Sequence, residues 1–509
     1  MNDRLIILEA LLLIEKGEDF GSRIIKDVLD KYAYLDRQHR SFIKRVLEGT
    51  LERRIEMDYI IDQFSKTPTA AMKPVILCIL RMSVYQLKYM DQVPTSAVCN
   101  EAVKLAEKKG FYKLKGFVNG VLRNIARNLE NIIYPELPYG DLSLVSPNAI
   151  TEDLIRYFSI RYSMPEFLVE HFLKYYGPEG NAHDEENGRS LATVENIFKA
   201  FLRENITTIR PNRSKATEEK LIKSLEEDGA KLIKIPDISF MEDISGCGDE
   251  AAKATIDLTA MSSMTKAYIL TDFNHLTDLK AFKEGLFTVQ DQSAMLPVAL
   301  SGIKAGDTVM DVCAAPGGKT IQAIDELCKL RKESDASNDH DCVKNGDNNA
   351  GTVYSFDVSE YKTDIIKENL ERCDFATNTG NSINVEMIVE VRDARIFNED
   401  YVNLVNVLIA DLPCSGLGII GRKSDIKYNV TSEGMQSLAE LQREILSNVV
   451  KYVKAGGTLM YSTCTLNPAE NEEQVKWMEE NLGLKCEEMH CILPSEYRDG
   501  FFVARMTKL

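Results

Sequence analysis

The sequence predicts a multi-domain protein with an all-α N-terminal domain, a small α/β middle domain and a C-terminal doubly wound α/β domain. Three observations predict this division. Apolar residues recur at helical spacing up to about residue 130, a stretch rich in proline and turn residues follows, and β-branched runs alternate with helices from residue 286 onward. A chain of 509 residues is also too long for one hydrophobic core. We place the domains at 1–135, 136–284 (with the linker) and 285–509.

The N-terminal region has the pattern of packed amphipathic helices. In SFIKRVLEGTLERRIEMDYIIDQF, residues 41–64, apolar residues return every three or four positions, and Pro74 and Pro94 mark breaks between helices. Residues 31–130 carry an excess of about eight positive charges, although the formal net charge of the whole chain is -17. A basic region interleaved with aromatic residues is typical of RNA-binding proteins, but it also describes an ordinary solvated helix face.

The middle region begins after a predicted linker, YPELPYGDLSLVSPNAI, at residues 134–150. From there to about residue 285, short helices alternate with the strand-like runs NITTIRPN, AKLIKI and AYILTDF, which predicts a small α/β domain. Polar segments near 179–194 and 241–256 are predicted surface insertions, and the segment at 331–351 is a predicted mobile loop of the C-terminal domain.

Composition limits the class of protein. The hydrophobic share of 44% and the charged share of 27% are those of a soluble globular protein. No apolar run reaches the roughly 20 residues that cross a bilayer, and LIILEALLLIEKGEDF near the start lacks the features of a signal peptide. Eleven cysteines occur without a CxxC pair, so we expect reduced thiols and no metal site. We expect a cytoplasmic protein that binds no membrane; a monomer is compatible with the sequence, which does not set the oligomeric state.

Functional side chains gather where the predicted strands of the C-terminal domain end. The runs DTVMDV, TVYSFDV, VEMIVEVRDA, NVLIADL and GTLMYST predict parallel strands, whose carboxyl ends bind ligands in doubly wound sheets. A single strand-end aspartate is common, because aspartate often caps helices. Six chemically active residues on one edge indicate a site. They are Asp311, Asp357, Asp393, Asp411, Cys414 and Cys464.

The turn after the first of these strands, CAAPGGKT, predicts a cofactor site. Its glycines allow the backbone to approach a ligand closely, Asp357 is placed to bind ribose hydroxyls, and Asp393 can accept from an adenine amino group. These contacts fit S-adenosyl-L-methionine. A phosphate-binding loop is a rival interpretation, although Cys313 stands where its first glycine belongs. The candidate cofactor residues are Cys313, Ala314, Ala315, Pro316, Gly317, Gly318, Lys319, Asp357, Asp393 and Asp411.

Two strand-end thiols suit the methylation of a cytosine at C5. Addition of a thiolate to C6 makes C5 nucleophilic, and after methylation a base removes the C5 proton and the thiol leaves. The route needs a nucleophilic cysteine, a second group that assists elimination and a partner for N3. Cys464, Cys414 and Asp411 can supply these three needs. Spacing alone does not decide which cysteine attacks.

CAAPGGKT, DLPCSGLG and YSTCT resemble successive motifs of the RNA cytosine-5 methyltransferases of the Nop2/Sun group. The N-terminal stretches DRQHRSFIKRVLEGTL and FVNGVLRNI resemble the antitermination factor NusB, and TIRPNRSKAT resembles part of the middle domain of the bacterial Sun/Fmu (RsmB) type. The resemblance implies a NusB-like RNA-binding domain and a Rossmann-like methyltransferase domain that uses S-adenosyl-L-methionine on small-subunit ribosomal RNA. It also implies that Cys464 is the nucleophile and that Cys414 assists release.

Other functions stay open beside this expectation. DNA cytosine methyltransferases attack with a Pro-Cys cysteine, which Cys414 would match, but only 45 residues follow Cys464 and leave no room for a DNA-recognition region. A transfer-RNA target is a further alternative. So is an RNA-binding assembly or antitermination factor with a vestigial catalytic domain.

The segment GRKSDIKY, residues 421–428, departs from the usual family pattern. Gly421 and Ser424 stand where arginine and proline are often seen. We expect the remaining cations of this segment to be available for the RNA backbone. They are Arg422, Lys423 and Lys427.

Overall fold

The computed structural model divides the chain into two compact units. One consists of Met1–Arg203 with Ile420–Asn429, and the other of Glu204–Ile419 with Val430–Leu509. The predicted domain boundaries after residues 135 and 284 stay predictions. Most of the predicted linker and of the three polar segments lies outside the described residues. The structure describes residues 2–17, 20–137, 151–178, 190–237, 264–337, 351–375 and 385–509.

The first unit is built from α-helices, as predicted for the N-terminal domain. Helix α5 has Pro74 at its start, where the missing N–H costs no hydrogen bond, and its apolar sequence is buried from Ile79 to Val84. It packs against α1, α3, α4, α6 and α7, so it forms the centre of this core. Pro94 precedes α6, as predicted. The helices are α1 (Asp3–Lys16), α2 (Gly21–Lys31), α3 (Arg37–Glu52), α4 (Arg54–Phe64), α5 (Pro74–Tyr89), α6 (Thr95–Lys108), α7 (Lys115–Arg127), α8 (Glu152–Tyr162), α9 (Glu166–Tyr176) and α10 (Leu191–Phe201).

The segment Ile420–Asn429, which contains the short helix α17 (Ile426–Asn429), belongs to this helical unit. Lys427 is 1% exposed, and its Nζ donates to the backbone carbonyl of Glu52 at 2.8 Å. Burial lowers the pKa of Lys427 to about 7 and raises the pKa of the Glu52 carboxyl to about 7. The expectation that Lys427 is available to an RNA backbone is therefore wrong, because the side chain is used inside the protein.

The second unit begins with an antiparallel four-stranded sheet in the order β2-β3-β1-β4. Three of its strands match the predicted runs of the middle domain. The short fourth strand was not predicted, because it lies in a segment assigned to the C-terminal domain. Leu225 of α11 and Phe287 of β4 pack in the core of this sheet. The elements are β1 (Thr207–Pro211), α11 (Glu218–Glu227), β2 (Lys231–Lys234), β3 (Tyr268–Thr271), α13 (Lys280–Lys283) and β4 (Phe287–Val289).

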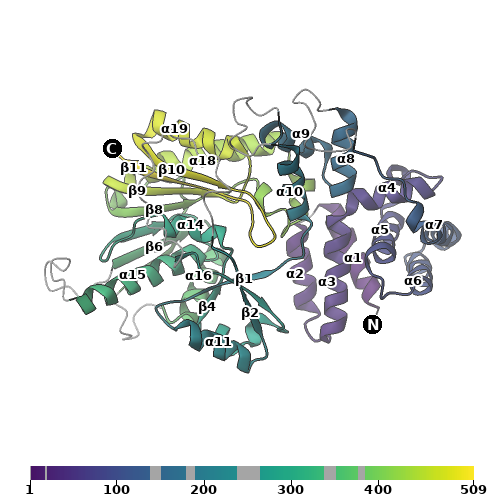
Figure 1. Cartoon of the computed structure of the whole chain (residues 1–509), viewed down its shortest axis with the longest axis horizontal. Coiled ribbons are helices and arrows are strands. Elements are labelled where there is room, and N and C mark those ends of the chain that lie inside the picture. Colours follow the sequence, from purple (N-terminus) through teal and green to yellow (C-terminus); the bar gives the residue numbers. More distant parts are fainter. Residues whose placement is uncertain are drawn as a thin grey trace. The chain divides into compact units, whose positions relative to one another are not determined.

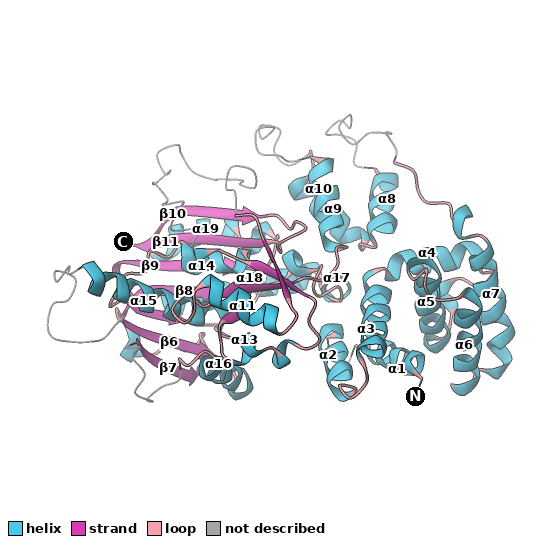
Figure 2. Ribbon diagram, turned by 60° about the horizontal axis from the view of Figure 1, so that its bottom comes forward, coloured by secondary structure: helices cyan, strands magenta, loops and turns pink. Residues whose placement is uncertain are grey.

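A seven-stranded sheet in the order β10-β11-β9-β8-β5-β6-β7 forms the rest of this unit (Figures 1 and 2). The five predicted strands, β5 to β9, pair in parallel, whereas β11 pairs antiparallel with β9 and β10. Helices α14, α15 and α16 cover one face, and α18 and α19 cover the other (Figure 1). This is the predicted Rossmann-like arrangement with an added antiparallel edge.

The strands of this sheet are β5 (Thr308–Asp311), β6 (Gly351–Asp357), β7 (Val385–Val391), β8 (Val405–Asp411), β9 (Val453–Thr463), β10 (Leu484–Ile492) and β11 (Phe501–Lys508). The helices on its two faces are α14 (Leu296–Ala299), α15 (Gly318–Ser337), α16 (Glu360–Arg372), α18 (Ser432–Val449) and α19 (Glu472–Leu482). In the described parts of the chain, no helix has both the length and the apolar content that crossing a bilayer requires.

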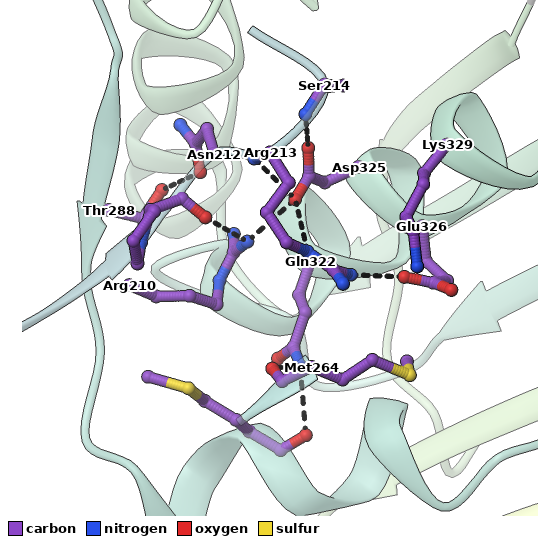
Figure 3. A network of polar contacts seen from close by, with 12 residues as sticks. Arg210, Asn212, Arg213, Ser214, Met264, Thr288, Gln322, Asp325, Glu326 and Lys329 are labelled. Atoms are coloured by element: carbon purple, nitrogen blue, oxygen red, sulfur yellow. Dashed lines mark hydrogen bonds and ion pairs between the residues drawn. The ribbon is translucent and has the colours of Figure 1, made fainter. Parts of the chain in front are cut away.

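A buried polar network joins the two sheets of this unit (Figure 3). Asp325 on α15 accepts hydrogen bonds from the Arg210 guanidinium at 3.1 Å and from the backbone N–H of Ser214 at 2.6 Å. The Nε of Arg210 donates to Gln290 at 2.9 Å, and Gln290 in turn donates to Gln322 on α15 at 2.9 Å. Because α15 starts at the turn CAAPGG, the network fixes the four-stranded sheet to the helix that follows the predicted cofactor turn.

Candidate active site

The parallel strands bring the predicted site residues to one edge of the seven-stranded sheet. Strand β5 is central; β8 and β9 lie on one side of it, and β6 and β7 on the other. The carboxyl ends of all five strands therefore meet at the same edge. Asp311, Asp357 and Asp411 are the last residues of β5, β6 and β8, whereas Asp393 and the two cysteines follow the ends of β7, β8 and β9.

The two thiols lie in direct contact. The Sγ atoms of Cys414 and Cys464 are 3.3 Å apart, although the residues are 50 positions apart in the chain. The hydrogen bond with Cys464 and burial both raise the pKa of the Cys414 thiol well above its ordinary value. Cys414 is therefore a protonated thiol at neutral pH, and its sulfur lies within hydrogen-bond distance of the sulfur of Cys464.

A close backbone approach fixes the spacing of the two cysteine turns. The N–H of Gly418 donates to the carbonyl of Cys464 at 3.0 Å, and the N–H of Gly500 donates to the carbonyl of Gly418 at 2.9 Å. A Cβ atom at Gly418 would stand 2.1 Å from the carbonyl oxygen of Gly500. Only glycine fits there, so the sequence DLPCSGLG carries its last glycine for a steric reason.

Asp411 and Lys319 form an ion pair beside the thiols. The Nζ of Lys319 lies 2.6 Å from Oδ2 of Asp411, and the Ser462 hydroxyl donates to Oδ1 at 2.9 Å. Burial alone would lower the pKa of Lys319, but the charge of Asp411 and its hydrogen bond outweigh burial, so that this pKa is raised. The lysine is therefore an ammonium ion held against the Asp411 carboxyl.

The predicted cofactor turn folds tightly against the end of β6. The N–H of Ala314 donates to the carbonyl of Phe356 at 2.9 Å, and the N–H of Gly317 donates to the carbonyl of Ala314 at 2.7 Å. Gly317 has φ of 101°, a conformation that favours glycine. Helix α15 begins at Gly318, so its first amides lie at this turn, where they suit a carboxylate.

The acids on the other side of β5 already have cationic partners. Asp357 is 4% exposed; it accepts from the N–H of Ala315 at 3.0 Å and lies 2.9 Å from Nζ of Lys362. Asp393 forms an ion pair with Arg395 at 2.6 Å. These are oxygen acceptors of the kind that bind the hydroxyl and amino groups of an adenosyl cofactor, so the residues fit S-adenosyl-L-methionine.

Asp311 lies at the centre of the edge and is 1% exposed. Its Oδ2 accepts from the Thr320 hydroxyl at 2.8 Å, whereas Oδ1 has no hydrogen-bond partner among the residues that the structure describes. Burial raises the pKa of this carboxyl to about 7, and the nearby charges of Asp411 and Asp357 add to the shift.

Sequence reasoning missed a group of buried polar residues behind the cysteines. The group contains Ser415, Gln442 and Glu470, which are joined by hydrogen bonds. Nothing in the pattern NPAENEEQ distinguishes Glu470 from the solvated acids that commonly start a helix. In the part of the chain that the structure describes, no group of His, Cys, Asp and Glu residues has the arrangement of a metal site.

Comparison with known proteins gives the family. Residues 1–127 match the model of the NusB family, and residues 343–507 match that of the 16S rRNA methyltransferase RsmB/F. The probable ribosomal RNA small subunit methyltransferase B of Bacillus subtilis (strain 168) is 31% identical over 471 residues, which cover 92% of this chain and 86% of the relative. The chain belongs to this methyltransferase family.

A further relative agrees with this assignment, and a solved structure shares the fold. The ribosomal RNA small subunit methyltransferase B of Proteus mirabilis (strain HI4320) is 26% identical, with 92% of this chain and 90% of the relative covered. The crystal structure of PH0851 superposes with a TM-score of 0.68 at 19% identity and covers 100% of this chain and 99% of that chain. At that identity, the likeness to PH0851 supports the fold alone. The predicted combination of a NusB-like domain with a methyltransferase domain is confirmed.

Proposed function

We propose that this protein transfers a methyl group from S-adenosyl-L-methionine to C5 of a cytosine in RNA, with the 16S RNA of the small ribosomal subunit as the substrate. The observation that carries the proposal is the contact between two thiols on the edge that also holds the cofactor turn and Asp411. A single cysteine would suffice for a nucleophile, whereas a second one in contact suits a reaction that must also release the nucleophile.

In the proposed reaction, the Cys464 sulfur forms a bond with C6, and the electron pair of the C5–C6 double bond becomes available at C5. S-adenosyl-L-methionine would supply the methyl group to C5 and would be left as S-adenosyl-L-homocysteine when its sulfur–methyl bond breaks. Asp411 is the hydrogen-bond partner for N3, and a proton held between N3 and this carboxyl stabilises the negative charge that the thiolate adds to the ring. In the last step a base takes the C5 proton, the C5–C6 double bond re-forms and the Cys464–C6 bond breaks, so that its electron pair returns to the Cys464 sulfur; Cys414 assists by donating its thiol proton to that sulfur.

RNA as the substrate rests on the family and on the site. The relatives are named ribosomal RNA small subunit methyltransferase B, and the first 127 residues match NusB. The C5 and C6 atoms are blocked within a stacked helix, so the target cytosine must be single-stranded or flipped out. The site residues, the cytoplasmic location and the domain boundaries belong to this proposal.

The experiment is methyl transfer by the full chain to unmodified 16S RNA, to small ribosomal subunits and to transfer RNA. We expect 5-methylcytidine in 16S RNA by nucleoside mass spectrometry, at a position that bisulfite sequencing of RNA from a strain lacking the protein identifies. Methylation of transfer RNA alone would show that transfer RNA, and not 16S RNA, is the substrate. RNA binding without methyl transfer would favour an assembly factor with a vestigial catalytic domain, and ATP binding without S-adenosyl-L-methionine binding would favour an NTPase.

A further inference from the structure

A buried carboxylate, Glu470, lies between the two cysteine turns. It is 0% exposed and belongs to the short helical turn Pro468–Glu470, which follows Cys464. Its two oxygens accept four hydrogen bonds. A buried carboxylate that is so fully paired fixes its donors in place, because each donor would otherwise be buried without a partner.

Two of the four donors come from the residue after Cys414. The backbone N–H of Ser415 donates to Oε2 of Glu470 at 2.9 Å, and the Ser415 hydroxyl donates to Oε1 at 2.5 Å. The side-chain amide of Gln442 donates to Oε2 at 3.1 Å and also to the carbonyl of Pro413 at 2.9 Å. The residues on both sides of Cys414 are therefore held by Glu470 or by its partner Gln442.

The same carboxylate is held by the turn that carries Cys464. The side-chain amide of Asn467 donates to Oε1 of Glu470 at 2.9 Å, and the Tyr461 hydroxyl donates to the Glu470 carbonyl at 2.5 Å. The Thr465 and Ser415 hydroxyl oxygens are 2.7 Å apart, which links the two turns directly. Glu470 thus fixes the Cys414 turn relative to the Cys464 turn.

We propose that Glu470 is a positioning residue of the release step, which holds Cys414 at the distance from Cys464 and from the modified base that elimination requires. The inference rests on the proposed function. Glu470 accepts two hydrogen bonds from Ser415, which is next to Cys414, but only one from Asn467, which is three residues after Cys464, so it acts on the release cysteine more directly than on the nucleophile. Its charge is also among those that raise the pKa of the Cys414 thiol, which places the two groups close together.

Glu470→Gln tests the proposal, because the amide keeps the size of the side chain and one accepting oxygen but replaces the other with a donor. We expect single-turnover methyl transfer to stay within about threefold of the wild type, while steady-state kcat falls about tenfold and KM changes little. The methylated covalent protein–RNA adduct should accumulate. Ser415→Ala removes one donor and no backbone group. It should lower steady-state kcat relative to the single-turnover rate of methyl transfer by a smaller factor than Glu470→Gln does.

Asp325→Asn is the matched control. Asp325 is equally buried and accepts several hydrogen bonds, but its partners lie in the network of Figure 3 and include no residue of either cysteine turn. The Asp325→Asn variant should lower thermal stability to a similar degree. It should not change the rate of adduct release relative to the rate of methyl transfer. In the double variant Cys414→Ala/Glu470→Gln, the loss in release should not exceed that of Cys414→Ala alone, because both changes act on one group.

Equal losses of transfer and release in Glu470→Gln, or a loss that adds fully to that of Cys414→Ala, would overturn the inference. These outcomes assume wild-type protein that makes 5-methylcytidine. Wild-type protein that makes none contradicts the proposed function instead, so the two failures are distinguishable.

Discussion

The two sides of the strand-end edge hold their functional groups by different means. At β6 and β7, Asp357 and Asp393 are paired with Lys362 and Arg395, whose side chains are each 47% exposed. At β8 and β9, buried hydrogen bonds fix the thiol turns, and Glu470 is wholly enclosed. Exposed ion pairs contribute little, about 0–1 kcal/mol, whereas an unsatisfied buried donor costs about 1–3 kcal/mol. The exposed Lys362 and Arg395 can therefore give way to a ligand at little cost, whereas the buried Asp357 and the thiol side keep one geometry.

The largest effect should come from the thiol side. Cys464→Ala removes the proposed nucleophile, so methyl transfer should fall by about a thousandfold or more. The covalent adduct with RNA that contains a 5-substituted cytosine should disappear, as measured by gel electrophoresis under denaturing conditions. Cys486→Ala, which changes a cysteine of β10 away from this edge, is the control and should keep its activity.

Cys414→Ala should separate the two steps. We expect steady-state turnover to fall about a hundredfold, because the adduct forms but is not released. The measurement is the amount of covalent protein–RNA complex after a single turnover. If this variant lost the adduct and Cys464→Ala accumulated it, the roles of the two cysteines would be exchanged.

On the acid side, Asp393→Ala should act on affinity alone. Loss of one hydrogen bond to a charged acceptor should weaken S-adenosyl-L-methionine binding about tenfold, as measured by calorimetry. The melting temperature should change by less than about 2 °C, because the ion pair with Arg395 is exposed. Arg395→Ala is the matched change of the partner. If Arg395→Ala weakened S-adenosyl-L-methionine binding as strongly as Asp393→Ala does, the cofactor contact would depend on both residues of the ion pair and not on Asp393 alone.

Asp311, where the two sides meet, should have its effect on stability, which should change with pH. Its pKa is raised from 3.8 to about 7 in the folded protein. The stabilising contribution of the neutral carboxyl is therefore complete below about pH 4 and is lost as the pH rises toward 7. Asp311→Asn should lack this loss, so its free energy of unfolding relative to the wild type should rise by up to about 4 kcal/mol between pH 4 and pH 8, at about 1.4 kcal/mol for each unit of pKa shift. Urea unfolding at several pH values measures it, and a constant difference would contradict the assignment.

Most of the strand-end edge is predictable from the sequence, because β-branched runs that end in Asp or Cys identify strands β5 to β9 individually. The antiparallel strands β10 and β11 were missed. LKCEEMHCI does not alternate cleanly between apolar and polar residues, and the position of β11 between β9 and β10 follows from pairing that is not local in the chain.

The buried charges could not be predicted for a related reason. Glu470 and Lys427 belong to polar stretches, NPAENEEQ and GRKSDIKY, that read as solvent-exposed. Charged residues are almost never fully buried unless they are paired, and most partners of these two lie outside the stretch that carries them. Lys427 and its partner Glu52 are 375 residues apart in the sequence.

The position of Ile420–Asn429 within the helical unit means that neither unit is a continuous piece of polypeptide. A fragment that starts at residue 204 would retain Lys427 without the Glu52 carbonyl that accepts its hydrogen bond. A fragment that ends at residue 203 would leave the N–H of Gly21 without the Asp425 carboxylate that now accepts it at 2.8 Å. Cutting the gene at that point therefore yields two incomplete folding partners, and mixing the two fragments should restore what each one lacks.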